Sequence, residues 1–482
     1  MERENPYITG ADRNQNIMFP ELVDEYVSED NPVRFIDAYV NNLNLFDLGF
    51  THSIPKQTGR PSYAPSDLLK LYIYGYLKKT RSSRQLSQLT HLNVEVFWLL
   101  KKLQPDFRTI SDFRKENTEG LKRVCKEFTM LCKKLNLFGG ELIAIDGSKF
   151  SAVNHNSKSV SKKDISELIQ QIDKNIEEHF SNLEKQDAIE QSVEQPSAEE
   201  LQEAISKLKK HKDYISKLGD ILEETGETQV SGTDPDCRKM RTGNQGIDMS
   251  YNVQIAVDSK NKLIVAHDIT NDSNDVNQLV PMADLAKKTL ELEELNVTAD
   301  KGYFNEEQIA ECESGKIKCY IPEPQKSHNK GKGLFTHRDF IYDKTNDLYV
   351  CPAKENLLRS GTVTKHGKQT GLYKTNACKK CKLFSKCTTS SDGRRIYRSE
   401  YRDIIETMQI RMKENPSPSN QRKSIAEHPF GTIKHTMQQG YFLLKGKSKV
   451  AAEISMSVLV YNMKRVMNIV GIVPLLEILR AN

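Results

Sequence analysis

Two aspartates each follow a short apolar run that is typical of a buried strand. Residues 142–145 (LIAI) precede Asp146, and residues 295–299 (LNVTA) precede Asp300. Sheets of α/β proteins carry their functional sites where strands end. Two carboxylates that face each other repel, and each resists ionisation unless a cation compensates. The pattern therefore predicts a site for cations that prefer oxygen ligands, Mg²⁺ or Mn²⁺.

A third acid suits the same site. Glu427 has Lys423 four residues before it and Lys434 seven residues after it, so both cations are expected on the face of the helix that carries the acid. Pro429 predicts that Glu427 lies near the first turn of its helix. Glu453, on an apolar-striped helix over residues 450–470, is the alternative third acid.

Three such acids fit phosphodiester chemistry. Two metal ions roughly 3.5–4 Å apart can activate an attacking oxygen and stabilise a leaving one, with one aspartate bridging both ions. The nucleophile is water for strand cleavage and a DNA 3′-hydroxyl for joining. Taken singly, each aspartate is better explained as a helix cap or turn residue, and only the three acids together favour a metal site. Asp258 is expected in a hairpin turn and Asp275 at a helix N-terminus, and neither is assigned to the metals.

The elements around the aspartates predict an α/β fold with a ribonuclease-H-like mixed sheet. After the strand that ends at Asp146 come a β-hairpin over 251–267, a helix over 275–290, the strand that ends at Asp300, a helix over 305–312 and a strand over 318–321. Residues 156–229 interrupt this order with two helical apolar stripes, the second opened by a capping box at Ser197. We expect an inserted antiparallel helical hairpin that contains no catalytic residue.

The first 135 residues are expected to be mainly helical. A helix is predicted over 66–77, and shorter ones over 83–89 and 94–101. Short, closely linked helices are compatible with a helix-turn-helix that enters the DNA major groove. Four cations would then contact phosphates: Arg81, Arg84, Lys101 and Lys102. A helical bundle that only packs is the alternative.

Four of the nine cysteines have metal-ligand spacing. Cys351, Cys378, Cys381 and Cys387 form C-x26-C-x2-C-x5-C. The close pair and the nearby third cysteine favour a tetrahedral, structural Zn²⁺ site on a β-rich insertion. Unliganded thiols are the alternative, and an iron–sulfur cluster is a weaker one.

Composition sets outer limits. The 482 residues exceed what one core usually organises, and the net charge is only +5, although basic residues cluster locally, as at Lys326 to Lys332. Without an apolar run of membrane length or a signal-peptide core, we expect a cytoplasmic, nucleoid-associated protein with no membrane partner.

At these residues the chain resembles the insertion-sequence DDE transposases, in particular a group with an InsH-type N-terminal region and a four-cysteine insertion. The resemblance covers nearly the whole chain and rests on these motifs: GRP at 59–61, YGYL at 74–77, RSSR at 81–84, IDG at 145–147, TDPD at 233–236, YNVQ at 251–254, ADKGY at 299–303 and EHPFG at 427–431. It implies Asp146, Asp300 and Glu427 as ligands of two Mg²⁺ (or Mn²⁺) ions. Relatives usually place a tyrosine and an arginine where this chain has Asn420 and Lys423, so Arg422 or Lys423 is expected to bind DNA together with Lys434.

The resemblance further implies partners and a domain order. The partners are double-stranded DNA with terminal inverted repeats, target DNA and, in synapsis, a homodimer or higher oligomer. The expected parts are a helical DNA-binding domain (1–135), a catalytic domain (140–155, 230–325 and 405–475), the hairpin insertion (156–229) and a four-cysteine insertion (326–404). The alternatives are a catalytically inactive transposase-derived DNA-binding protein and a ribonuclease-H-like nuclease without joining activity.

Overall fold

The computed structural model describes residues 22–54, 61–153, 159–187, 198–242, 246–324, 331–365 and 368–481. Gly59 and Arg60 of the first motif, and Lys326 of the basic cluster, lie outside these ranges. The chain divides into two compact units, one up to Lys126 together with the segment from Leu459 onward, and one from Glu127 to Val458.

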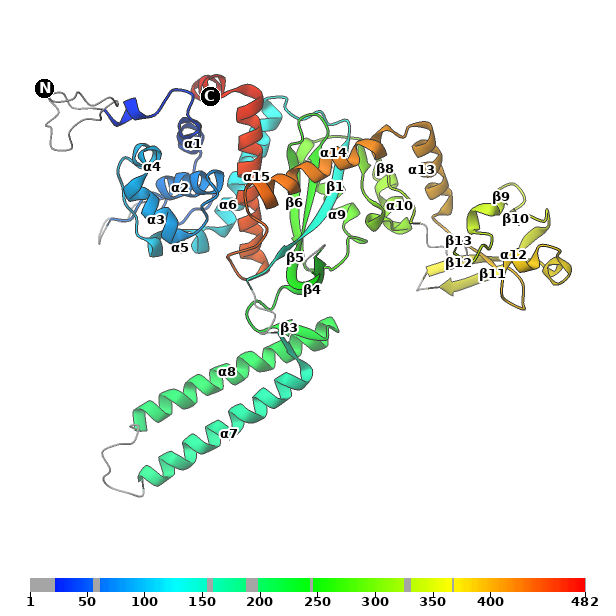
Figure 1. Ribbon diagram of the computed structural model, residues 1–482, viewed down its shortest axis with the longest axis horizontal. Helices are drawn as coiled ribbons and strands as arrows, with labels where there is room; N and C mark the ends of the chain where they lie inside the picture. Colours follow the sequence, from blue (N-terminus) through cyan, green and yellow to red (C-terminus); the bar gives the residue numbers. More distant parts are fainter. Residues whose placement is uncertain are drawn as a thin grey trace, which may run out of the picture. The chain divides into compact units, whose positions relative to one another are not determined.

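The first unit is helical, which confirms the prediction of a helical N-terminal region (Figure 1). Buried tyrosines of α2 form much of its core, and Asn42 Nδ2 donates a hydrogen bond to the Leu479 carbonyl, 2.8 Å away. The C-terminal helix therefore completes the N-terminal unit. The elements are η1 (Val23–Tyr26), α1 (Pro32–Asn41), α2 (Pro65–Leu77), α3 (Ser83–Leu92), α4 (Val94–Leu99), α5 (Phe107–Glu116), α6 (Thr118–Lys134) and α16 (Ile472–Ala481).

The second unit is built on a mixed six-stranded sheet. Strand β1 pairs antiparallel with β5 and parallel with β7, and β7 pairs parallel with β8. Strands β4 and β6 share the other edge of β5. The order β6-β5-β1-β7-β8 confirms the mixed sheet and is consistent with a ribonuclease-H-like core. The strands are β1 (Ile143–Ser151), β4 (Arg238–Thr242), β5 (Gly246–Asp258), β6 (Ile264–Thr270), β7 (Leu295–Thr298) and β8 (Ile317–Tyr320).

Helices cover the sheet on both faces. Alternate residues of β1 point to opposite faces, so Ile143 and Ile145 join an apolar core with α9, α10 and α13, whereas Phe150 contacts Phe430 of α14. Figure 1 shows α14 lying across the sheet near β1. The helices are α9 (Leu279–Leu290), α10 (Glu306–Ser314), α13 (Arg402–Glu414), α14 (Ser417–Gly431) and α15 (Lys447–Val470).

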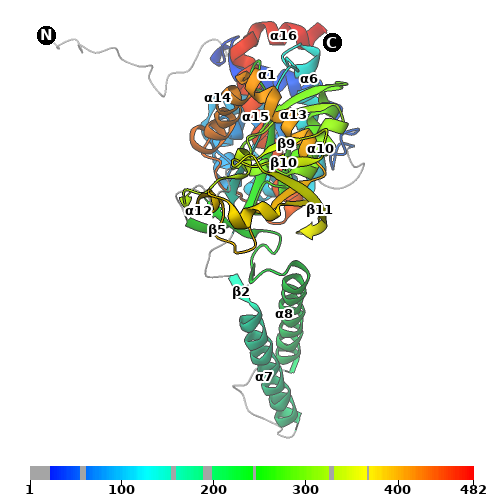
Figure 2. The same cartoon turned by 90° about the vertical axis from the view of Figure 1, so that its right-hand side faces the viewer.

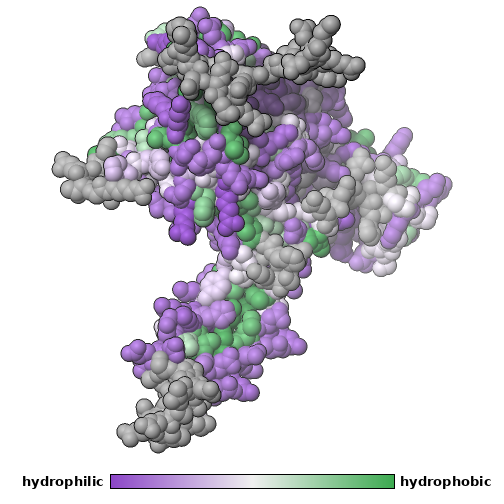
Figure 3. Space-filling model, turned by 60° about the vertical axis from the view of Figure 1, so that its left-hand side comes forward, coloured by the Kyte–Doolittle hydropathy of each residue, from purple (hydrophilic) through white to green (hydrophobic). Residues whose placement is uncertain are grey.

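Two long helices, α7 (Lys162–Asp187) and α8 (Ala198–Thr225), lie side by side in both views (Figures 1 and 2). Short strands β2 (Ser159–Ser161) and β3 (Gln229–Ser231) pair at their base. Residues of the predicted stripes, such as Ile172 and Leu222, are buried or partly buried, but Phe180 is 44% exposed, and the side chain of Leu183 lies outside the described part of the chain. Apolar side chains accordingly show among hydrophilic ones on the hairpin surface (Figure 3).

The cysteine-containing segment forms a second, antiparallel sheet in the order β13-β12-β11-β10-β9. Its elements are β9 (Ile341–Asp343), β10 (Leu348–Val350), β11 (Asn356–Lys365), β12 (Lys368–Lys374), η6 (Asn376–Lys380), α12 (Phe384–Cys387) and β13 (Ile396–Ser399). Within the described ranges no single helix is long and apolar enough to cross a membrane; α15 and α16 meet that test only as a pair bent by 103°.

Candidate active site

Asp146 lies inside β1, not beyond its end. The strand continues to Ser151 because β5 pairs with it along its full length, so the predicted strand end was wrong. The side chain of Asp146 points to the face that α14 covers, where Arg422 lies 3.8 Å from Oδ2. Asp146 is thus held on a rigid element in the middle of the sheet.

Asp300 follows the end of β7, as the sequence predicted. The parallel register pairs Ala144 with Thr298, and two further residues along each strand bring Asp146 and Asp300 to matching positions. Asp300 caps the short helix η4 (Lys301–Tyr303), with Oδ1 accepting a hydrogen bond from the Gly302 backbone N–H at 2.7 Å. Two acids with 153 residues between them in the chain (300 − 146 − 1) therefore lie at matching positions, one on β1 and one just beyond the end of β7.

The electrostatics of Asp146 favour a bound cation. Burial raises the pKa of its carboxyl to about 6, and the negative charges of Asp300 and Asp275 add to this rise. Arg422 and the Gly147 backbone N–H oppose the rise in pKa. A divalent cation beside Asp146 would offset the cost of ionising the buried acid.

Glu427 lies on α14, which packs against the sheet through Ile425, Ala426 and Phe430. The expectation of a first-turn position was wrong, because α14 begins at Ser417 and carries Pro429 near its end. Pro429 has no backbone N–H to donate to the helix, and a π-helical turn, Thr432–Thr436, follows it in the chain. The Glu427 side chain is 61% exposed, so it can adjust its position toward the sheet.

The cation between the acids is Arg422. Its guanidinium lies 3.8 Å from Asp146 Oδ2 and 3.9 Å from Glu427 Oε1. Lys423 is exposed on α14 and makes neither contact. Of the two adjacent cations considered from the sequence, Arg422 is therefore the one that faces the acids.

Lys434 is half-buried, whereas Lys423 is exposed to solvent. Lys434 lies in the π-helical turn, which changes the helical phase, and Nζ donates to Ser148 Oγ and to the Lys149 carbonyl, each at 2.6 Å. Burial lowers the pKa of Lys434 to about 8, with a further contribution from the Lys149 charge. Lys434 thus places a partly buried cation on β1, at Ser148 and Lys149, two to three residues beyond Asp146 in the strand.

Two family models match the chain. Residues 350–467 match the model described as Transposase DDE domain, and residues 21–116 match the one described as Transposase domain (DUF772). The chain therefore carries a transposase N-terminal domain and a DDE transposase domain. The match over residues 350–467 contains Arg422, Glu427 and the four cysteines, whereas Asp146 and Asp300 lie outside both matches. No curated protein and no solved structure matches this transposase.

The role of Asp275 in the transposase was not predicted from the sequence. Asp275 was expected to cap a helix, but α9 begins at Leu279 and Gln278 precedes it. Instead, Asp275 Oδ1 accepts hydrogen bonds from Asn252 Nδ2 and Gln254 Nε2, each at 2.7 Å, and lies 3.3 Å from Lys149 Nζ. This polar cluster lies on the face of β1 opposite to Asp146.

Gly147 makes room for that cluster. A Cβ on Gly147 would lie 2.3 Å from Gln254 Nε2, 2.7 Å from Asp275 Oδ1 and 3.0 Å from the Tyr303 hydroxyl. The Tyr303 hydroxyl in turn donates to Gln254 Oε1. The signal for the cluster was present in the sequence, because Asn252 and Gln254 are polar residues that alternate with the apolar residues Tyr251, Val253 and Ile255.

Two other acids have structural partners. Glu453, the alternative third acid, is buried and accepts hydrogen bonds from the backbone N–H groups of Leu443 and Leu444. Asp258 accepts hydrogen bonds from the backbone N–H groups of Lys260 and Gly139, in keeping with its expected turn role. Both carboxylates therefore have roles in holding loops.

The N-terminal cations of the transposase differ in accessibility. Arg84, Lys101 and Lys102 are exposed, and the Arg84 guanidinium lies over the Phe107 ring, 5.5 Å from its centroid. Arg81 is only 6% exposed, so in this conformation a phosphate cannot reach it. This burial differs from the expectation that Arg81, like the other three cations, contacts a DNA phosphate.

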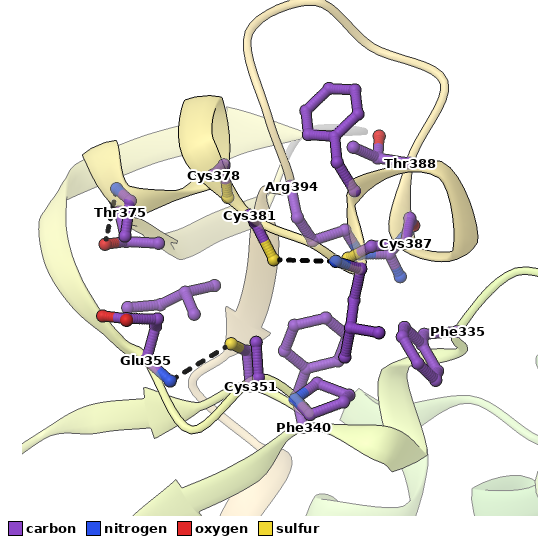
Figure 4. A pocket seen from close by; sticks show the side chains of 16 residues that line it. Phe335, Phe340, Cys351, Glu355, Thr375, Cys378, Cys381, Cys387, Thr388 and Arg394 are labelled. Carbon is purple, nitrogen blue, oxygen red and sulfur yellow. Dashed lines mark hydrogen bonds between the residues drawn. The ribbon is translucent and has the colours of Figure 1, made fainter.

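The four spaced cysteines surround one small cavity (Figure 4). Its volume is about 20 Å³, enough for a single ion or water. Cys351 Sγ accepts a hydrogen bond from the backbone N–H of Glu355, and Cys381 Sγ accepts one from the backbone N–H of Leu383. The distance from nitrogen to sulfur is 3.4 Å in each. Burial raises the pKa of the Cys387 thiol, with contributions from the three other thiols. The remaining cysteines are buried packing residues.

In the described ranges, no three His, Cys, Asp or Glu side chains lie as close together as the ligands of one metal ion. The structure thus brings the acids to one face and the thiols to one cavity, but leaves each set wider than a closed coordination shell.

Proposed function

We propose that this transposase binds double-stranded DNA at terminal inverted repeats and catalyses Mg²⁺-dependent strand cleavage followed by strand transfer to target DNA. The observation that carries the proposal is the pairing of β1 with β7, which sets Asp146 and Asp300 at matching positions under the helix that carries Glu427. In this proposal these three acids hold two Mg²⁺ or Mn²⁺ ions.

The donor set fits such ions. All three ligands are carboxylates, which hard divalent cations prefer, and the buried Asp146 needs a positive neighbour to stay ionised at neutral pH. When bound, the ions activate the attacking oxygen and stabilise the leaving oxygen of the scissile phosphodiester. The acids stand wider apart than one coordination shell, so the proposal requires the exposed Glu427 side chain to move inward on metal and DNA binding.

The cations around the acids would position the DNA. Arg422 lies next to Asp146, and Lys434 contacts Ser148 on the same strand. Both would bind phosphates of the strand to be cut, with the exposed Lys423 contributing from α14. In the N-terminal unit, Arg84, Lys101 and Lys102 would contact the phosphates of the terminal repeat. Arg81 stays in the proposal only as a buried residue that supports this region. Synapsis of two DNA ends would require a homodimer or higher oligomer.

The cysteine cavity is proposed to hold one structural Zn²⁺ through Cys351, Cys378, Cys381 and Cys387. Four thiols around a cavity of ion size, two of them accepting backbone N–H groups, form a suitable donor set. The division of the chain into four parts at the boundaries given above remains part of this proposal.

The test supplies purified protein with a donor DNA flanked by inverted repeats, a target plasmid and Mg²⁺. Joined products support the proposal. Cuts without joining would indicate a nuclease, and binding alone an inactive DNA-binding protein. Asp146→Asn, Asp300→Asn and Glu427→Gln should each lower the cleavage rate by more than the roughly 10–100-fold cost of losing a residue that only orients a metal ligand, while sparing DNA binding.

Asp284→Asn is the matched control, since it removes a carboxylate from an exposed position on α9. It should cleave and join like the wild type. Substantial Mg²⁺-dependent cleavage by any one of the three active-site variants would remove that acid from the site.

A further inference from the structure

The guanidinium of Arg422 occupies the space between two of the proposed metal ligands. Its two terminal nitrogens divide between Asp146 Oδ2 (3.8 Å) and Glu427 Oε1 (3.9 Å). The Arg422 side chain is only 15% exposed, so it is held inside the site and does not extend into solvent. A cation therefore already stands where the acids would hold a divalent ion.

The hold on Arg422 is electrostatic and loose. Both contacts are longer than a hydrogen bond, and Arg422 has no closer polar contact within the described ranges of the chain. Arginine forms its strong interactions as paired, short hydrogen bonds to a carboxylate or phosphate, and neither acid provides that geometry here. An arriving DNA phosphate could provide it, so leaving the acids would cost the guanidinium little.

We propose that Arg422 keeps divalent metal ions out of the DNA-free site and releases the acids when a DNA phosphate draws its guanidinium away. This inference rests on the proposed function. Like charges a few ångströms apart repel strongly in a partly buried site, so Arg422 between the acids weakens metal binding. DNA would remove that repulsion, and metal and DNA would strengthen each other's binding by the same factor. An enzyme of this kind loads its ions only where DNA is already bound.

The adjacent residue provides a matched control. Lys423 carries the same charge on the same helix, but it is exposed and lies away from the acids. Arg422→Gln and Lys423→Gln therefore change the net charge equally, and only the first removes the cation from between the acids.

The experiment measures Mn²⁺ binding to the full-length protein by electron paramagnetic resonance of free Mn²⁺, with and without duplex DNA. Without DNA, Arg422→Gln should bind Mn²⁺ at least about tenfold more tightly than the wild type, within the usual range of coupling between two sites. In the absence of DNA, where the proposed phosphate contact of Lys423 plays no part, Lys423→Gln should bind Mn²⁺ as tightly as the wild type does. Adding DNA should tighten Mn²⁺ binding to the wild type and have a smaller effect on Arg422→Gln.

Two negative results have different meanings. If Arg422→Gln and the wild type bind Mn²⁺ equally in the absence of DNA, the gating role of Arg422 is wrong, even if the acids are the ligands. If Asp146→Asn binds Mn²⁺ as tightly as the wild type with DNA present, the proposed metal ligands themselves are wrong.

Discussion

Replacing Gly147 by alanine would test whether the polar cluster behind Asp146 supports the sheet. The new methyl group would stand 2.3 Å from Gln254 Nε2 and 2.7 Å from Asp275 Oδ1. Gln254 is fully buried and is held at both ends, by Asp275 and by Tyr303, so it cannot turn away without losing hydrogen bonds. The backbone of Gly147 lies outside the left-handed region, so alanine adds contacts without adding backbone strain.

The magnitude follows from three contributions. Overpacking of a buried position costs about 1–3 kcal/mol. Loss of the hydrogen bond from Gln254 to the charged Asp275 costs about 1.5–3 kcal/mol. The stiffer unfolded chain of the alanine variant returns about 0.4–1 kcal/mol. The free energy of unfolding should therefore fall by about 2–5 kcal/mol.

The assay is urea unfolding followed by far-ultraviolet circular dichroism, with Gly431→Ala as the matched control. Gly431 lies at the end of α14 and has nothing within 4 Å of an added Cβ, so its variant should lose no stability. A Gly147→Ala protein within about 0.5 kcal/mol of the wild type, the range of a neutral surface change, would refute this account of the cluster.

Three further predictions concern charge and metal. The pKa of Asp146 in the folded protein is about 6, above its usual 3.8, so the folded protein binds this proton more tightly than the unfolded chain does. Metal-free protein should therefore lose up to about 3 kcal/mol of stability as the pH rises from 4 to 7.5, measured by urea unfolding at the two pH values. Asp146→Asn should not show that loss. Lys434 loses its charge as the pH rises through about 8, so DNA affinity measured by fluorescence anisotropy at fixed salt should fall between pH 7 and 9, and Lys434→Arg, which stays charged, should remove the fall. Elemental analysis should find about one zinc per chain in the wild type and none in Cys378→Ser, and a wild type without zinc would end the zinc proposal.

Much of the fold could be predicted because periodicity reports burial directly. The strands at Asp146 and Asp300, the two hairpin helices and the order of elements around the sheet all show apolar residues at strand or helix spacing. The end of β1 could not be predicted, since residues 147–151 are mostly polar and are held in the strand by pairing with β5. Tertiary pairing, which leaves no local signal, decided that boundary.

The site was less predictable than the fold. Asp275 was assigned to a helix cap because only its local sequence was considered, whereas its partners Asn252 and Gln254 lie more than twenty residues earlier. Which of Arg422 and Lys423 faces the acids depends on how α14 is rotated about its axis relative to the sheet. The sequence of the helix alone does not determine that rotation. The π-helical turn that redirects Lys434 follows from Pro429, but its extent depends on packing.

The helix α16 has a consequence for how this protein matures. Because the N-terminal unit includes the segment from Leu459 onward, and Asn42 Nδ2 donates a hydrogen bond to the Leu479 carbonyl, its core cannot close until the ribosome has synthesised α16. A product that ends before α16 would leave the face of α1 that contacts α16 uncovered and accessible to chaperones and proteases. Only molecules that contain α16 would then present a completed N-terminal unit, a quality check on each newly made copy.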